Sequence, residues 1–128
     1  MSCSTNNDRE KLEHLLRYIK RTLNDVHIIG VRDLKTLVTW VDASYAVYPN
    51  MRGQTGGAMS FGTGIIHGRS SKQKLNSKSS MESKIIGVSE YLPFHIWTVN
   101  FMKSQGYNID KKILYQDNKS AILLERNG

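Results

Sequence analysis

Two aspartates each follow an apolar, strand-like run, a placement typical of metal-dependent phosphodiester chemistry. Asp42 comes after residues 35–41 (K-T-L-V-T-W-V), whose β-branched and aromatic side chains predict a strand that ends at or near this aspartate. Asp117 comes after residues 112–116, which predict a second short strand. Carboxylates that converge from strand ends and from the start of a helix form two-metal sites in α/β proteins. The two aspartates are therefore candidate ligands of divalent cations.

The segment between these strands predicts the helix start that such a site requires. One residue in it is positively charged, however, where the site needs a negatively charged side chain. Ser79 or Ser80 can cap a helix that runs to about Glu90. The first turn of this helix holds Glu82 and Lys84. Lys84 stands where a two-metal site would require a carboxylate.

The first half of the chain predicts a helix and a hairpin around these segments. Apolar residues at helical spacing indicate a helix over residues 9–24, with Asp8 as its N-cap. Residues 57–61 and 64–67 predict two short strands, and Gly62-Thr63 between them is a good hairpin signal.

The second half predicts the elements that complete a mixed sheet. Pro93 suits either the first turn of a second helical segment or a kink, and Gly106 marks where that helical region stops. A last helix is expected over residues 118–125, capped by Asn118. The order of elements suggests an antiparallel meander that gains a parallel strand after a helical crossover.

Length and charge limit the classes of protein to consider. The 128 residues suffice for one domain, and no apolar run of membrane-spanning length is present. The N-terminus lacks the layout of a signal peptide, and the single cysteine, Cys3, suits a reducing compartment. The net charge of +7 favours polyanionic partners.

Several segments of the chain follow the sequence patterns of one family, in the same order and at nearly the same spacing. The family patterns are L-R-Y-L-K-G-T, S-D-A-D-W-A, P-x-x-R-x-x-T-x-G, S-K-K-Q, S-S-T-E-A-E, L-W and Y-C-D-N-Q-S-A-I. The similar segments here are residues 16–22, 41–46, 49–57, 70–73, 79–84, 96–97 and 115–122. Together they resemble the ribonuclease H domain of copia-type retrotransposon polyproteins, preceded by the last helix of the reverse transcriptase.

The resemblance implies an architecture and a division of the chain. Residues 1–30 would be a tail and the last helix of the reverse transcriptase region, and residues 31–128 a ribonuclease H-like domain. The implied fold class is α/β, with a three-stranded antiparallel meander, a parallel strand and helices. In the family a fifth strand and a final helix follow, so we expect this domain to be truncated at its C-terminus.

The resemblance also implies an activity and its cofactor. Four carboxylates would hold two Mg²⁺ ions that cleave the RNA strand of RNA–DNA hybrids. Asp42 and Asp117 match two of these carboxylates, and Lys84 matches the position of a third. Glu82 lies two residues earlier, about 200° around a helix, and is expected to point away from the site. An ammonium about 4 Å from a divalent ion is repelled by several kcal/mol, so we expect no cleavage by this chain.

The expected partners are nucleic acid and the rest of a retrotransposon polyprotein, in a particle that would be cytoplasmic. Residues expected to contact nucleic acid are Arg52, Arg69, Lys72, Lys74, Lys78 and Asn118. The basic run over residues 69–78 is alternatively a solvated loop. Trp40, Trp97 and Phe101 are expected in the core and not as stacking platforms for bases. Two other functions stay open: a non-catalytic nucleic-acid-binding module and a non-functional genomic remnant.

Overall fold

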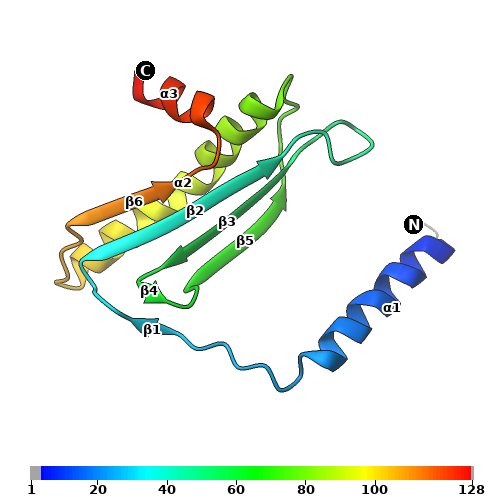
Figure 1. Ribbon diagram of the computed structural model, residues 1–128, viewed down its shortest axis with the longest axis horizontal. Coiled ribbons are helices and arrows are strands. Elements are labelled where there is room, and N and C mark those ends of the chain that lie inside the picture. The colour runs from blue at the N-terminus through cyan, green and yellow to red at the C-terminus, as the bar shows by residue number, and fades with distance from the viewer. Residues whose placement is uncertain (1–3, 128) are drawn as a thin grey trace.

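A mixed four-stranded sheet, backed by one long helix, forms the centre of the molecule (Figure 1). The computed structural model describes residues 4–127, so Cys3 and Gly128 lie outside the described residues. The elements in chain order are α1 (Asn6–Arg21), β1 (Gly30–Val31), β2 (Thr36–Ser44), β3 (Gln54–Ser60), β4 (Gly62–Thr63), β5 (His67–Lys72), α2 (Ser80–Ser104), β6 (Lys111–Tyr115) and α3 (Lys119–Asn127).

The order of the strands confirms the mixed sheet. The strands lie in the order β5-β3-β2-β6, and β3 pairs antiparallel with both β2 and β5. After α2 crosses the sheet, β6 pairs parallel with β2, from Thr36 beside Lys111 to Trp40 beside Tyr115. This arrangement is compatible with a ribonuclease H-like fold.

Alternation along β2 separates a buried face of the sheet from an open one. Leu37, Thr39, Val41 and Ala43 are buried, whereas Asp42 is exposed on the opposite face. The buried face packs on α2, which lies behind the sheet in Figure 1. The main core cluster consists of Leu37, Val41, Met59, Phe61, Val88, Tyr91 and Ile109.

The strands begin and end at other residues than expected. The reason is that hydrogen-bonded pairing between strands continues beyond the residues that follow an apolar pattern. β2 continues past Asp42 to Ser44, which pairs with Gln54 on β3. The expected hairpin is present, since β3 pairs antiparallel with β5, but its connection is longer than the two residues expected, because Gly62-Thr63 form β4 and pair with β1. The third strand of the meander is β5, which includes polar residues for which a solvated loop was the alternative.

The helix over residues 80–104 is continuous, so a second helical segment does not begin at Pro93. Val88 and Tyr91 before the proline and His95 and Thr98 after it are all buried. Both halves of the helix therefore pack against the core. The helix begins after the N-cap Ser79, and Gly106, whose φ is +86°, follows its end as expected.

α1 extends from the sheet on a separate segment and has no buried residue (Figure 1). Its N-cap is Thr5 and not Asp8, because Asp8 occupies the third helical position of a capping box with Thr5. The expected division after residue 30 falls inside β1, which already pairs with β4. None of the described helices is long and apolar enough to cross a membrane.

Three aromatic side chains expected in the core are exposed. Trp97 and Phe101 stack on each other on α2, with ring centres 5.2 Å apart, and Trp97 is 65% exposed. Trp40 is 44% exposed on the open face and stacks on Tyr115, with ring centres 6.1 Å apart. The alternation of β2 explains Trp40, because it shares the open face with Asp42.

A buried histidine makes the stability of the fold depend on pH. His95 Nδ1 lies 2.8 Å from Thr39 Oγ1, and burial, with a smaller effect of Lys112, lowers the pKa of His95 below its ordinary 6.5. The unfolded chain therefore binds a proton more readily than the folded chain. We expect the free energy of unfolding to fall as the pH drops below 6.5, by at most about 1.4 kcal/mol per pH unit.

Urea denaturation at a series of pH values measures this effect. The control His95→Gln keeps a polar side chain that does not titrate, and its stability should vary less over the same pH range. Parallel curves for the two proteins would contradict the assignment to His95.

Candidate functional site

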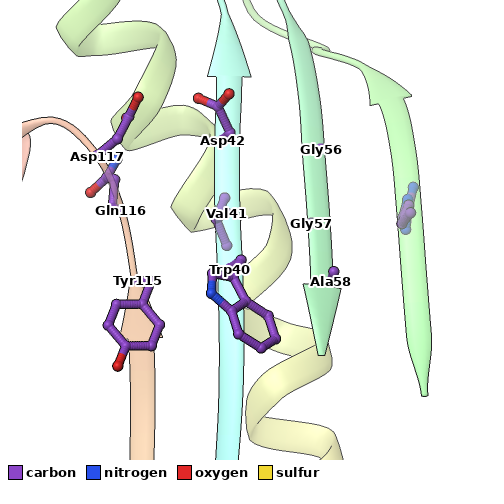
Figure 2. A pocket seen from close by; sticks show the side chains of 10 residues that line it. Trp40, Val41, Asp42, Gly56, Gly57, Ala58, Tyr115, Gln116 and Asp117 are labelled. Atoms are coloured by element: carbon purple, nitrogen blue, oxygen red, sulfur yellow. The ribbon is translucent and has the colours of Figure 1, made fainter. Parts of the chain in front are cut away.

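The parallel pairing of β2 and β6 brings Asp42 and Asp117 together. Trp40 lies beside Tyr115 in the register, and each aspartate comes two residues after one of these aromatic residues. Side chains that are two residues apart along a strand lie on the same face of the sheet. Figure 2 shows Asp42 and Asp117 at the same end of the two strands, beyond the rings of Trp40 and Tyr115.

Lys84 reaches the two aspartates from the first turns of α2. Its Nζ lies 2.9 Å from Asp42 Oδ1 and also donates a hydrogen bond to Asp117 Oδ1. The lysine side chain is only 12% exposed, whereas those of Asp42 and Asp117 are 71% and 67% exposed. The ammonium therefore lies beneath the two carboxylates, which face solvent.

The charges in this cluster stabilise one another. The hydrogen bond from Lys84 is the main cause of a lowered pKa of Asp42. Burial acts to lower the pKa of Lys84, but the hydrogen bonds to Asp117 and Asp42 and the charges of these two carboxylates together outweigh burial, and the pKa is raised. Lys84 thus stays protonated and Asp42 ionised across the neutral range of pH.

The cluster does not fit a divalent cation. A Mg²⁺ ion needs several oxygen ligands around a cavity of its own size, and here the ammonium of Lys84 lies between the two carboxylates. Within residues 4–127, no group of three or more His, Cys, Asp or Glu side chains could hold a metal ion. The positive charge between the two carboxylates is therefore the ammonium group of Lys84.

Glu82 does not take part in the cluster. Its carboxylate accepts a hydrogen bond of 2.6 Å from the backbone N–H of Lys78, while its own N–H donates to Ser79 Oγ. Glu82 therefore serves the start of α2 and lies on another side of the helix from Lys84. Asn118 serves the start of α3, because its Oδ1 accepts from the N–H of Ala121 at 2.9 Å.

The expected nucleic-acid-binding cations have different surroundings in the structure. The guanidinium of Arg69 lies 4.9 Å from the centre of the Phe94 ring, and Lys72 Nζ lies 4.4 Å from the centre of the Tyr48 ring. Lys74 and Lys78 are exposed in the segment between β5 and α2. Arg52 is half-buried in the connection between β2 and β3.

A cleft of about 660 Å³ opens beside the two aspartates on the open face of the sheet. Trp40 and Tyr115 line one part of the cleft, and Gly56 and Ala58 of β3 line another (Figure 2). The residues on β3 have little or no side chain, so this surface of the sheet can be approached closely.

A buried polar network next to Lys84 was not anticipated from the sequence. Gln73, Thr55 and Ser83 are buried, Gln73 is hydrogen-bonded to each of the other two, and Thr55 Oγ1 donates to Glu90 Oε2 at 2.9 Å. The S-K-Q run drew attention to Gln73 as part of a family pattern, but no periodicity or spacing indicated that its side chain is buried.

Sequence similarity relates the chain to one large polyprotein. It is 30% identical over 120 residues, 93% of its length, to the retrovirus-related Pol polyprotein from transposon TNT 1-94 of Nicotiana tabacum. The chain spans 9% of the length of that polyprotein. No family model matches the chain. The similarity supports an origin of this chain in a retrotransposon polyprotein.

Proposed function

We propose that this region of a retrotransposon polyprotein is a ribonuclease H-like domain whose hydrolytic site is closed by Lys84. The observation that carries the proposal is the position of the Lys84 ammonium between Asp42 and Asp117. The similarity to the Pol polyprotein and the mixed sheet support the domain assignment. The convergence of the two aspartates supports an ancestral metal site.

Physical chemistry argues against displacement of Lys84 by a metal ion. A divalent ion near the two carboxylates would meet a protonated amine that is buried and hydrogen-bonded to both. At about 4 Å, this repulsion amounts to several kcal/mol even at an effective dielectric constant of 20. If Lys84 moved away, it would leave hydrogen bonds that now stabilise it in its buried position.

A hybrid-cleavage assay with the natural chain tests this proposal. A labelled RNA–DNA hybrid is incubated with the protein in Mg²⁺ or Mn²⁺, and both cleavage and binding are scored. We expect no cleavage. Cleavage that disappears in Asp42→Asn would contradict the closed site, and would show that the two aspartates act with a ligand not identified here.

Binding without cleavage is the second candidate function, and the charge of the chain favours it. The net charge is +7, and the exposed Lys74 and Lys78 follow β5. β5 ends at Lys72, which lies across β3 from the end of β2, so these lysines are at the same end of the sheet as the aspartates. They could contact a phosphate backbone next to the cleft.

Salt dependence measures this contribution. We expect hybrid affinity to fall with rising salt, and the double variant Lys74→Ala, Lys78→Ala to reduce the slope of log K against log salt by about 1 to 2. The matched control is Lys11→Ala, Lys20→Ala on α1, which changes the net charge equally and should leave the slope nearly unchanged. Equal slopes for the two double variants would contradict a binding role of this end of the sheet, and a complete lack of binding would favour a genomic remnant.

A further inference from the structure

The side chain of Gln73 is completely buried where three elements meet beside the Lys84 cluster. It follows β5 directly, and its backbone N–H donates to the carbonyl of Gly53, just before β3, at 2.8 Å. Its side chain then reaches the first turns of α2. A buried amide is stable only where its hydrogen-bonding groups have partners, and here both ends of the amide do.

The amide of Gln73 makes three hydrogen bonds, two of them to Ser83 and one to Thr55. Nε2 donates to the carbonyl oxygen of Ser83 at 2.8 Å, and Oε1 accepts from Ser83 Oγ at 3.0 Å. Nε2 also donates to Thr55 Oγ1 on β3 at 3.1 Å. The residue before Lys84 is therefore tied to the sheet through one side chain.

One further contact and one close approach define the surroundings of Ser83. Ser83 Oγ lies 3.3 Å from the carbonyl oxygen of Ser44, the last residue of β2. A Cβ on Gly53 would come within 2.4 Å of Gln73 Oε1 and 2.7 Å of Ser83 Oγ. The absence of a side chain at position 53 is therefore necessary for the close approach of these groups.

The position of Ser83 determines where Lys84 can reach. Consecutive residues of an α-helix differ by about 100° in the direction of their side chains and by about 1.5 Å in position along the helix axis. A small rotation or shift of α2 would therefore separate Nζ of Lys84 from one of the two aspartates. Hydrogen bonds to both sides of Ser83 resist both movements.

We infer that Gln73 is a positioning residue of this site, which orients the start of α2 so that the side chain at position 84 projects between Asp42 and Asp117. The inference rests on the function proposed above, because it assigns a role within the same site. Gln73 itself touches neither aspartate in the described structure and acts through Ser83.

Chemical modification of lysines tests this role in the natural full chain. The amines are acylated for increasing times, and mass spectrometry of peptides gives the rate at each lysine. Lys84 should react slowly because it is buried and ion-paired, with the exposed Lys74 and Lys78 as internal references. In Gln73→Leu we expect Lys84 to react about tenfold faster. Its slow acylation in the natural chain depends on the position of the first turns of α2, which Gln73 holds through Ser83.

The matched control is Thr98→Val on the same helix. Thr98 is also buried, and its Oγ1 donates to the carbonyl of Phe94 at 2.8 Å, far along α2 from Lys84. This variant should leave Lys84 protected relative to the two reference lysines. Equal exposure of Lys84 in Thr98→Val and Gln73→Leu would show a general loosening of the fold and would overturn the positioning role.

A milder variant keeps the test decisive if Gln73→Leu does not fold. Ser83→Ala removes only the hydroxyl, whose single proton is donated to Gln73 Oε1 at 3.0 Å and lies near the Ser44 carbonyl, and should also increase the acylation of Lys84, by a smaller factor. Full protection of Lys84 in folded Ser83→Ala and in any folded Gln73→Leu would overturn the inference. Cleavage of hybrid by the natural chain would instead overturn the proposed function, and it leaves the acylation result unaffected.

Discussion

Lys84→Glu is expected to convert the pair Asp42 and Asp117 into a binding site for divalent cations. The substitution removes the ammonium that lies between the two carboxylates and places a third carboxylate on the same helix position. Without metal, three like charges repel one another, so the variant should unfold at a lower temperature than the natural chain. With Mn²⁺ at about a hundred times its dissociation constant, the melting temperature should rise by about 10 °C.

Differential scanning calorimetry with and without Mn²⁺ measures this shift. The matched control is Lys84→Met, which removes the ammonium without adding a ligand and should respond much less to the metal. The natural chain should show no comparable shift. Equal responses of Lys84→Glu and Lys84→Met would contradict the assignment of position 84 to the site.

Gly57→Ala is expected to cause the largest loss of stability among single-methyl substitutions in β3. Its new Cβ would lie 2.2 Å from Cδ2 and Cε2 of Tyr91. The ring of Tyr91 is 1% exposed, and its hydroxyl lies 2.8 Å from His67 Nδ1, so it has little freedom to move away. We expect a loss of about 3 kcal/mol in the free energy of unfolding, at the upper end of the usual range for overpacking.

The neighbouring glycine supplies the control for this prediction. A Cβ on Gly56 would face the cleft, where the nearest atom, the carbonyl oxygen of Asp42, lies 3.9 Å away. Gly56→Ala should therefore change the stability by no more than about 0.5 kcal/mol. Urea denaturation of both variants gives the comparison, and similar losses would contradict the packing of α2 against β3.

Part of the sheet could be predicted from the sequence because strands β2 and β6 contain β-branched or apolar runs and α2 has clear ends. The β-branched run before Asp42 and the shorter run before Asp117 indicate strands β2 and β6, and the helix between them indicates a parallel crossover. Ser79 and Gly106 mark the two ends of α2 as expected. These features depend on local chemistry, which the sequence displays directly.

The strand β5 could not be predicted in the same way. Its residues 67–72 are mostly polar, and on composition they resemble a solvated loop. They form a strand because β3 offers a continuous row of backbone groups from Gln54 to Met59, which pair with them one by one. Such pairing depends on the neighbouring strand and leaves little trace in the apolar pattern.

The site shows a similar division between what the sequence indicates and what it does not. Strand ends predict that Asp42 and Asp117 approach each other, and the family pattern places Lys84 next to them. The sequence did not indicate that Lys84 would bind both aspartates as an internal cation. It also did not indicate the network around Gln73, because a polar residue in a basic run gives no sign of burial.

A titration of the natural chain with Mn²⁺, followed by NMR, tests the central claim most directly. A bound paramagnetic ion broadens the signals of nearby backbone amides, so the amides of Ala43 and Asp117 report on the site. If Lys84 fills the position of the metal, these signals should broaden no more than those of other exposed residues, up to millimolar Mn²⁺. Selective broadening of Ala43 and Asp117 at micromolar Mn²⁺ would show that the two aspartates bind a metal ion despite Lys84, and would contradict the proposal of a closed site.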